Sequence, residues 1–454
     1  MAGLSDKYSR LAALRPARPG LSRPATLRAP NREDFLSQLL GAGIATNHYG
    51  EHISVRNWFS SPEFAQPSDL ALDLLSRSRD EAMTKRMRKA VADPEKWLFL
   101  DTETTGLSGG TGTYAFLIGL AWWDAGGFQV EQLFLRDFAE EHSILHEVAR
   151  RLAERPVLVT FNGKTFDWPL LENRFAMTRA IAVPRLAAHL DLVHPARALW
   201  RPRLGSVRLV DLERYVLDPV RLGWHRDDDV ASTVIPQQYF DFLRGGPVEP
   251  LVAILRHNQM DLRGLAALFG KINALLADEP RSEEVESLDL FGLSRFLQRR
   301  GDAQRAHSTC AQAIALGLPF EFDRQARGEL ALLAKRRGEH ESAAALWEEL
   351  AKDEEDGVQA CEQLAIYHER RRKDFGSALE FAQLALGKAR RMQSFGADPR
   401  VGKKGARREQ SLVNRVARLK LRIAGEARVL PALPLSPAGR LAADRKAVTS
   451  YNGG

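Results

Sequence analysis

The sequence predicts an α/β domain, in which helices flank a mixed central sheet, followed by an all-α domain of repeated helices. Strand-like and helix-like patterns alternate between about residues 95 and 278. From about residue 284 to 390 only helical patterns remain, and they recur with a nearly fixed spacing. The chain has 454 residues, which is enough for two or three domains with well-buried cores.

The mixed sheet is predicted from three closely spaced strands that are followed by further α/β units. This arrangement implies a mixed sheet covered by helices. Pro250 lies where the first turn of the last helix is expected, and proline is common at that position. The expected strands cover residues 97–103, 114–123, 127–136 and 156–161, and the expected helices cover residues 141–154 and 249–276.

The sequence divides into five segments. Residues 1–32 are rich in Pro, Arg and Ala without periodicity, which predicts a disordered basic tail. Residues 33–92 form an N-terminal extension of unassigned role, with a strand expected near residues 51–58. The α/β domain is expected over 93–280, the helical repeats over 284–390, and a basic helix (about 407–423) with a disordered tail over 391–454.

The helical repeat is marked by three short turns, Gly301-Asp302, Gly338-Glu339 and Lys373-Asp374, each leading to an alanine over five residues. The turns are 37 and 35 residues apart, close to the 34-residue period of tetratricopeptide repeats. A plain helical bundle remains the alternative. Either arrangement is a packing or interaction surface, because the segment holds no convergent acid–base group, so a protein partner is expected there.

Composition excludes several classes of protein. The chain is 44% hydrophobic and 27% charged, as in ordinary soluble proteins and unlike disordered or collagen-like chains. Its two cysteines, Cys310 and Cys361, exclude a disulfide framework and suggest core positions in a reducing compartment. No apolar run approaches the roughly 18 to 20 residues of a membrane span, and the first residues lack the apolar core of a signal peptide. We expect a cytoplasmic protein without membrane contact.

Positive charge is concentrated near both ends of the chain. The formal charge of +7 divides into +6 over residues 1–32, +10 over residues 388–423 and −9 over the rest of the chain. Basic ends around an acidic middle favour contact with a polyanion, and nucleic acid is the leading candidate. The alternative is that both ends serve only to solubilise the chain.

The first chemical motif is the string Asp101-Thr-Glu103-Thr-Thr-Gly106-Leu at the end of an expected strand. Side chains alternate between the faces of a strand, so Asp101 and Glu103 project from the same face, about 6 to 7 Å apart. Two like charges on one face repel unless a divalent cation neutralises both. Gly106 then allows a sharp turn. The alternative is that these acidic residues simply end a strand.

The second motif places Asp167 between an expected strand and an expected helix. The loop Asn162-Gly163 follows the strand, and Pro169 is expected to start the helix. Sites in α/β proteins form at this rim of the sheet. The alternative is that Asp167 only caps the helix or pairs with its dipole.

The third motif is His257-x-x-x-Asp261 in the long helix, beside an expected packed stripe. The two residues are four apart and therefore share one face of the helix. A carboxylate so near the buried surface is costly unless it is paired or bound to metal. A histidine one turn earlier could act as the base for a metal-bound water. An intrahelical ion pair at a solvated edge is the alternative. The packed stripe is formed by Ile254, Asn258, Leu262, Leu265, Phe269 and Ile272.

The four acids, in this order and on these elements, resemble those of the DEDD-type 3′–5′ exonucleases of the ribonuclease H-like superfamily. The string from Asp101 is similar to the first motif of that family, and Asn-x-x-x-Phe-Asp, ending at Asp167, is similar to the second. The third motif of the family is either Tyr-x-x-x-Asp or His-x-x-x-x-Asp. Here His257 precedes Asp261 at the shorter spacing, which is that of the tyrosine branch.

A closer resemblance is to the bacterial YprB-like ribonuclease H-like proteins, over roughly residues 40–275. The strings at residues 107–116, 194–206 and 239–244 carry this resemblance. A helical-repeat extension after the nuclease-like domain also fits it. The glycine-rich stretch at residues 109–113 lacks a following Gly-Lys-Ser/Thr, so it is not expected to cradle a nucleotide.

The resemblance implies that Asp101, Glu103, Asp167 and Asp261 hold two Mg²⁺ or Mn²⁺ ions about 4 Å apart. One ion would activate a water whose proton His257 accepts, and the other would stabilise the leaving 3′ oxygen. Ligation by carboxylates alone suits these hard cations better than zinc.

The resemblance also implies that the backbone near Thr104, the side chain of Leu107 and Asn162 contact the terminal nucleotide. Further along the chain, arginines surround Trp200, an arrangement in which guanidinium groups could pair with phosphates and the indole could stack on a base. The alternative is a solvated basic loop with one anchoring tryptophan. The arginines are Arg197, Arg201, Arg203 and Arg208.

The expected function is that of a metal-dependent 3′–5′ exonuclease that hydrolyses phosphodiester bonds at the ends of single-stranded DNA or RNA. One alternative is a catalytically silent ribonuclease H-like module that binds nucleic acid while its helical repeats recruit a protein. A structure-selective endonuclease is the other, because the wider superfamily includes endonucleases.

Overall fold

The computed structural model describes residues 38, 41–60, 89–106, 112–124, 126–217, 223, 226, 228–277, 285–352, 357–395 and 399–429. The chain forms two compact units, unit 1 (Met1–Pro280) and unit 2 (Arg281–Gly454). The tail predicted at residues 1–32, residues 107–111 and the stretch after residue 429 lie outside the described residues. Within the described part of the chain, none of the helices combines the length and apolar character that a membrane crossing requires.

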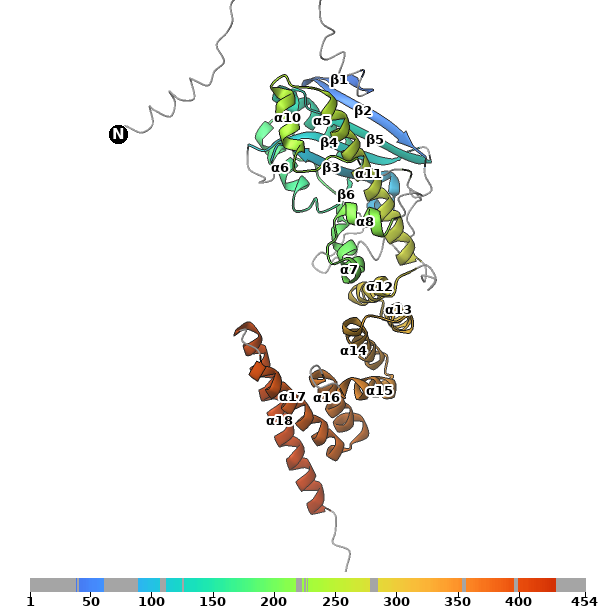
Figure 1. The fold of residues 1–454 in the computed structure, drawn as a ribbon, viewed down its shortest axis with the longest axis vertical. Coiled ribbons are helices and arrows are strands. Elements are labelled where there is room, and N and C mark those ends of the chain that lie inside the picture. Colours follow the sequence, from blue (N-terminus) through green and yellow to red (C-terminus); the bar gives the residue numbers. More distant parts are fainter. Residues whose placement is uncertain are drawn as a thin grey trace, which may run out of the picture. The chain divides into compact units, whose positions relative to one another are not determined.

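Unit 1 is built on a seven-stranded mixed sheet, which confirms the predicted fold class (Figure 1). The strand order is β1-β2-β5-β4-β3-β6-β7, and only the β3–β6 and β6–β7 pairs among these strands are parallel. The strands are β1 (Gly43–Asn47), β2 (Gly50–Phe59), β3 (Trp97–Thr104), β4 (Ala115–Asp124), β5 (Gly127–Phe134), β6 (Val157–Thr160) and β7 (Ala188–Asp191).

Two strands come from the N-terminal extension, to which the sequence assigned no role. The strand predicted near residues 51–58 is β2, and it pairs with β1 on one side and with β5 on the other. Ile53 and Val55 of β2 alternate along the strand and are both buried in the main core of unit 1. Residues 43–59 therefore extend the same sheet that contains β3 to β7.

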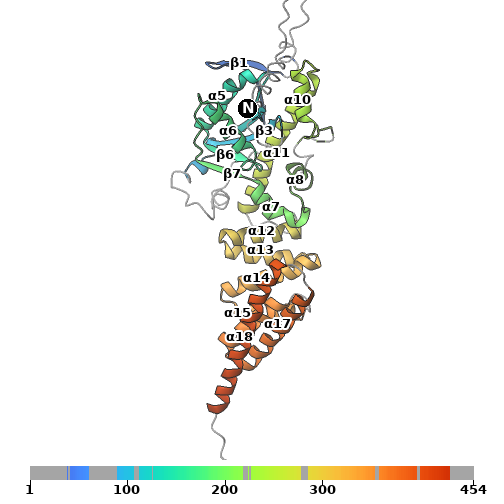
Figure 2. The ribbon, with the colours of Figure 1, turned by 90° about the vertical axis from the view of Figure 1, so that its left-hand side faces the viewer.

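Helices cover both faces of this sheet (Figures 1 and 2). On β5, the Gln132 side chain donates to the backbone oxygen of Leu255, while Glu131 accepts a hydrogen bond from Arg151. Because neighbouring residues of a strand point to opposite faces, the helices that carry Leu255 and Arg151 cover opposite faces. The helices of unit 1 are α5 (Glu141–Glu154), α6 (Asp167–Thr178), α7 (Val193–Leu204), α8 (Leu209–Tyr215), α10 (Ile235–Leu243) and α11 (Glu249–Ala277).

Helix α11 packs across β3, β4 and β5 and covers the face of the sheet that holds the candidate site. All six residues of its predicted packed stripe are buried, which confirms the helical pattern. At the base of β3, the Trp97 ring meets the Phe269 ring with centroids 4.8 Å apart. Gly119 of β4 permits the close approach of α11, because a Cβ atom there would lie 2.3 Å from Asn258 Oδ1 and 2.7 Å from Leu262 Cδ1.

Unit 2 is helical throughout its described residues, as the sequence predicted, and successive helices pack on one another. Each of the three predicted turns falls between two consecutive helices. Cys310 and Cys361 are buried free thiols, in agreement with the predicted core positions. The predicted basic helix is longer than expected. The helices are α12 (Ser287–Arg300), α13 (Ala303–Ala315), α14 (Phe320–Arg336), α15 (His340–Ala351), α16 (Val358–Tyr367), α17 (Phe375–Phe395) and α18 (Pro399–Val429).

Candidate active site

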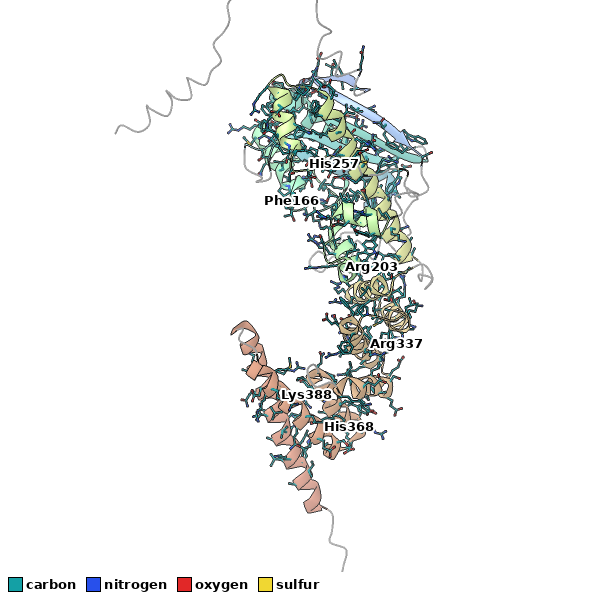
Figure 3. All side chains as sticks on the ribbon, in the orientation of Figure 1. Phe166, Arg203, His257, Arg337, His368 and Lys388 are labelled. Carbon is teal, nitrogen blue, oxygen red and sulfur yellow. The ribbon has the colours of Figure 1, made fainter. Side chains whose placement is uncertain are left out.

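Asp101 and Glu103 lie near the C-terminal end of β3, on the face that α11 covers. The Asn258 side chain donates a 2.8 Å hydrogen bond from Nδ2 to Asp101 Oδ2. Glu103 Oε1 is 3.7 Å from His257 Nε2. Both acids thus contact the same stretch of α11, the one that carries His257, which Figure 3 labels.

Asp167 reaches the end of β3 from the start of α6. This helix begins at Asp167 itself, two residues earlier than the sequence predicted, and Phe166 occupies the capping position without a side-chain hydrogen bond. The Thr102 hydroxyl donates a 2.5 Å hydrogen bond to Asp167 Oδ1. The carboxylate therefore contacts the strand that carries Asp101. Asp167 also lies in the first turn of α6, where its charge can pair with the helix dipole, as in the alternative interpretation.

The loop before α6 is held by a buried carboxylate on β7. Asp191 Oδ1 accepts the backbone N–H of Asn162 at 2.7 Å, and its Oδ2 accepts that of Lys164 at 3.0 Å. Asn162 has a φ of 67°, which asparagine tolerates better than most residues. At Gly163, a Cβ atom would lie 2.5 Å from the Thr160 side chain. This tight turn places Asp167 at the rim of the sheet.

Asp261 lies one turn after His257 on α11, as predicted. Its Oδ1 pairs with Arg226 Nη2 at 2.5 Å, and its Oδ2 is 3.6 Å from His257 Nε2. The predicted His257–Asp261 pair therefore exists at the edge of the acid cluster, but it is looser than the ion pair with Arg226.

The pKa values of Asp101, Glu103 and Asp167 show that these three acids share one electrostatic environment. Burial and then the charges of Asp261, Asp167 and Glu103 hold the pKa of Asp101 well above its usual range, against the hydrogen bond from Asn258. Burial, with smaller contributions from Asp261 and Asp167, raises the pKa of Glu103 to about 8, although His257 opposes the rise. Burial also raises the pKa of Asp167 to about 6, against the hydrogen bond from Thr102. The fold thus collects carboxyl groups whose ionised forms repel one another, a repulsion that protonation or a bound cation would relieve.

His257 is buried and hydrogen-bonded on the side away from the acids. Its Nδ1 lies 2.9 Å from Asp229 Oδ1 and 2.8 Å from Asp229 Oδ2. Burial lowers the pKa of His257, but the hydrogen bond that its ring donates to Asp229 and the charges of Asp261 and Glu103 outweigh it, so the pKa is raised overall. Although burial opposes it, the contact with His257 and the ion pair with Arg226 lower the pKa of Asp229. Asp229 is therefore a carboxylate that fixes the imidazole ring.

Arg226 links the His257–Asp229 pair to Asp261 and to a buried acid, Glu213. Its guanidinium contacts Asp229 Oδ2 at 2.9 Å and the two oxygens of Glu213 at 2.5 and 2.7 Å, in addition to Asp261. Glu213 belongs to α8, and α11 accommodates it only because residue 264 is glycine, where a Cβ atom would lie 1.9 Å from Glu213 Oε1. This buried ionic network connects α8, the turn at Arg226 and α11.

The donors suit a hard divalent cation in kind, because four carboxylates supply only oxygen. The raised pKa values of Asp101, Glu103 and Asp167 also indicate a cluster that binding of a cation would stabilise. However, no group of three or more His, Cys, Asp or Glu residues in the described parts of the chain is gathered closely enough to hold a metal ion as it stands. For the predicted ligand set to close, Asp261 would have to share or release Arg226.

The predicted substrate contacts differ in how the structure places them. Thr104 lies at the end of β3 and donates to the backbone oxygen of Gly106 at 3.0 Å, whereas Leu107 lies outside the described residues. Asn162 is in the loop that leads to Asp167. Trp200 is only 1% exposed, so the idea that it stacks on a base is wrong: its indole is buried. The chain bends into helix α7 there, and the apolar side of that helix carries the tryptophan inward.

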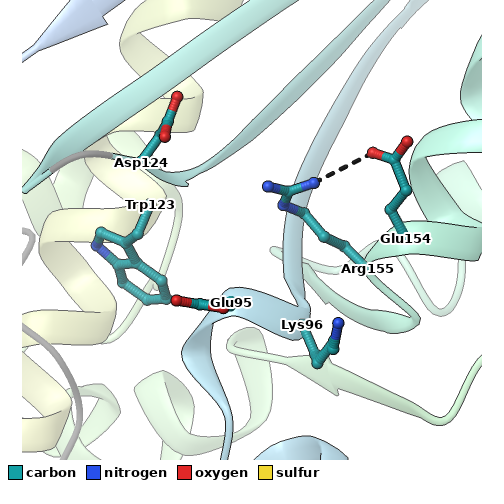
Figure 4. Close-up of a pocket in the computed structure, with 6 residues that line it drawn as sticks. All are labelled: Glu95, Lys96, Trp123, Asp124, Glu154 and Arg155. Carbon is teal, nitrogen blue, oxygen red and sulfur yellow. Dashed lines mark hydrogen bonds and ion pairs between the residues drawn. The ribbon is translucent and has the colours of Figure 1, made fainter.

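A hollow of about 480 Å³ lies away from these acids (Figure 4). It adjoins the start of β3 and the end of β4, and an ion pair between Arg155 and Glu154 crosses its wall. None of the acids, nor His257, lines it. The hollow is therefore separate from the acid cluster, and its walls carry both signs of charge. It is lined by Glu95, Lys96, Trp123, Asp124, Glu154 and Arg155.

Sequence reasoning missed Arg226, Asp229 and Glu213, although the chain holds a weak signal for them. Arg226 is followed by three aspartates in a segment without periodicity, which resembles an ordinary solvated loop. Asn258 carried a clearer signal, because it was the one polar residue in the packed stripe of α11, where a buried amide needs partners.

Comparison with known proteins agrees with this geometry. Residues 98–273, which include the four acids and His257, match a family described as the RNase_H superfamily. The chain is also 32% identical over 299 residues to the protein YprB of Bacillus subtilis strain 168, which is described as uncharacterized. The match covers 64% of this chain and 69% of YprB. The chain therefore belongs to the family of YprB, and its unit 1 contains an RNase H superfamily domain.

Proposed function

We propose that unit 1 is a metal-dependent 3′–5′ exonuclease that hydrolyses phosphodiester bonds at the ends of nucleic acids. One observation carries the proposal. Asp101, Glu103, Asp167 and Asp261 come from three separate elements, yet the charges of nearby acids help to raise the pKa of each of the first three. Such a concentration of partly buried carboxylates is costly for folding, which is expected where function requires it.

Two Mg²⁺ or Mn²⁺ ions, when bound, would activate the attacking water and stabilise the charge that develops on the leaving 3′ oxygen. The residues of the chain would do the rest. The carboxylates of Asp101, Glu103, Asp167 and Asp261 would supply the oxygen ligands, and Asn258 would keep one of them oriented. His257 Nε2 faces Glu103 and Asp261, where it could accept the proton of a water held between them.

The proposed substrate is a single-stranded end of DNA or RNA. Thr104 and Asn162 flank the acids and would contact the terminal nucleotide, together with Leu107. The two basic ends of the sequence would raise affinity for any nucleic acid through release of counterions, without selecting its sequence.

Unit 2 is proposed to be a tetratricopeptide-like array that recruits a protein. Support comes from the three turns at Gly301, Gly338 and Lys373, each of which separates two packed helices at nearly constant spacing. An array of this kind would hold a partner beside the nuclease-like domain without contributing to its chemistry.

One observation favours a second candidate, a catalytically silent nucleic-acid-binding module. Arg226 already neutralises Asp261, and in a module without turnover such an arginine could replace a cation permanently. The two candidates differ in their dependence on metal: the module would bind nucleic acid with or without a divalent cation and would leave it intact.

The test is a digestion panel with 3′- and 5′-labelled DNA and RNA strands in Mg²⁺, Mn²⁺ or chelator. The exonuclease predicts shortening from the 3′ end that requires a divalent cation. Asp101→Ala should slow cleavage roughly a thousandfold, because loss of a metal ligand removes about 4 kcal/mol of transition-state stabilisation. Asp124→Ala, at the exposed far end of β4, is the matched control and should leave the rate unchanged.

Two outcomes would contradict the proposal. Equal cleavage by wild type and Asp101→Ala would place the activity elsewhere, and tight binding without cleavage in either metal would support the silent module. A closed circular strand separates the exonuclease from an endonuclease, because an exonuclease has no end at which to start.

A further inference from the structure

The orientation of His257 is set from outside the four acids. Its ring is only 6% exposed on α11, so it has little freedom to turn. One ring nitrogen, Nδ1, lies within 2.9 Å of both oxygens of Asp229. The other, Nε2, points toward Glu103 and Asp261 at 3.7 and 3.6 Å. The two nitrogens thus face two different carboxylate environments, one at hydrogen-bonding distance and one beyond it.

These contacts determine which nitrogen carries hydrogen in the neutral ring. A carboxylate can only accept a hydrogen bond, so the nitrogen in contact with Asp229 must be the donor. A neutral imidazole has one N–H, and the hydrogen bond made by one nitrogen decides the state of the other. With Nδ1 protonated, Nε2 presents its lone pair to the space beside Glu103 and Asp261. A base that accepts a proton from a water in that space needs this tautomer.

Asp229 is itself held in place and kept ionised. It lies in the turn that begins at Arg226, where its backbone N–H donates to the Arg226 carbonyl at 3.1 Å. The Arg226 guanidinium contacts Asp229 Oδ2 at 2.9 Å and is anchored on its other side by buried Glu213. The side chain of Arg226 is 9% exposed and that of Asp229 12% exposed, so the pair is largely shielded from solvent. Such a network orients a functional side chain with little motion.

We propose that Asp229 is a positioning residue for the reaction of unit 1: it holds His257 in the Nδ1–H tautomer, with Nε2 directed at the acid cluster. This inference rests on the proposed function, in which His257 accepts the proton of the attacking water. It also gives a histidine at this shorter spacing from Asp261 a partner that orients its ring.

The first test measures the tautomer directly and needs no activity. Full-length protein with ¹⁵N-labelled histidine would be examined by NMR at a pH above the titration of the His257 ring, with His257→Gln used to assign the signals. Wild type should show hydrogen on Nδ1 and a bare Nε2. Asp229→Asn should show loss of this preference, because the amide can donate to Nδ1 as well as accept from it. Hydrogen on Nε2 in wild type would overturn the proposal even if the enzyme were active.

The second test measures turnover on a labelled strand. Asp229→Asn should lower kcat by about ten- to a hundredfold, the usual effect of losing a residue that orients a functional side chain, with a smaller change in KM. Asp228→Asn is the matched control, because Asp228 is the exposed neighbour of Asp229, and its kcat should match wild type. In a His257→Gln background, Asp229→Asn should cause little further loss, since its effect acts through the ring.

The outcomes separate this inference from the proposed function. If wild type cleaves no substrate in any metal, the exonuclease proposal fails while the NMR result still decides the role of Asp229. If wild type is active and Asp229→Asn keeps its full kcat, or loses as much activity with glutamine at 257 as with histidine, then Asp229 does not act through His257 and the inference is wrong.

Discussion

Asn258 and Asp101 join α11 to β3 at the centre of the acid cluster. The amide nitrogen of Asn258 lies 2.8 Å from Asp101 Oδ2 and 3.3 Å from the backbone oxygen of Asp101. On its other side, Asn258 Oδ1 accepts a 2.8 Å hydrogen bond from Gln132 of β5. One buried amide thus connects the helix to two strands, and Gly119 leaves the space that it occupies.

Replacing this amide should weaken both the fold and the proposed chemistry. Asn258→Leu keeps a similar volume but removes the donor to Asp101 and the acceptor for Gln132, which leaves buried polar groups unsatisfied. We expect the free energy of unfolding to fall by about 2 to 3 kcal/mol. Urea unfolding followed by tryptophan fluorescence measures this in unit 1, because seven of the eight tryptophans precede residue 281.

Gln259→Leu is the matched control for this prediction. Gln259 is the next residue on the same helix and is only half-buried, so its replacement should change stability by no more than about 0.5 kcal/mol. Equal stability of the two variants would show that the Asn258 amide does not hold α11 to the sheet.

The stability of unit 1 should fall when the positive charge of Arg226 is removed from its ionic network. Arg226→Met leaves Glu213, Asp229 and Asp261 close together without their shared partner, and the side chain of Glu213 is only 5% exposed. Removing one member of a buried ion pair costs about 3 to 5 kcal/mol, because the remaining charge stays desolvated. The same fluorescence measurement should therefore show a large loss of stability in unit 1.

Two further variants test whether buried charge is the cause. Adding Glu213→Gln to Arg226→Met removes one uncompensated charge and should recover part of the loss. Arg208→Met breaks an ion pair with Asp211 in which the arginine is 76% exposed and screened by solvent, so it should change stability little. If Arg208→Met were as damaging as Arg226→Met, burial of the network would not explain its importance.

Much of unit 1 could be predicted from sequence because its signals are local. Helix α5 was predicted with the observed limits, and α11 differs from its prediction by one residue, since the spacing of apolar residues specifies a helix without reference to the rest of the chain. The acids on β3 could be placed on one face by the alternation of side chains along a strand.

The remainder depends on contacts between distant segments. Arg226 meets Glu213 and Asp261 across 13 and 35 residues of sequence, and no periodic pattern marks such a meeting. Trp200 misled for a related reason: the arginines around it suggested an exposed surface, whereas the fold buries the indole. Local patterns locate elements, but they do not tell which charged side chains of a loop turn inward.

The acid cluster should make the stability of unit 1 fall as pH rises. Burial and neighbouring charges raise the pKa of Glu103 from its usual value of 4.5 to about 8, so between these values the folded state holds a proton that the unfolded chain has lost. The unfolded state then binds fewer protons, and the free energy of unfolding decreases across that window. The raised pKa of His257 acts in the same direction above its usual value of 6.5.

Glu103→Gln should reduce this pH dependence, because the amide does not titrate. In chelator, we expect the variant to lose less stability than wild type between pH 5 and pH 8. At pH 8 it should be more stable than wild type by about 4 kcal/mol, because each unit of the pKa difference corresponds to about 1.4 kcal/mol. Urea unfolding at several pH values measures both quantities.

Mg²⁺ or Mn²⁺ should stabilise wild type more at pH 8 than at pH 5, since protons compete with the cation for the carboxylates, and should stabilise Glu103→Gln less. A variant with the pH dependence and metal response of wild type would mean that Glu103 neither retains the proton nor binds the ion.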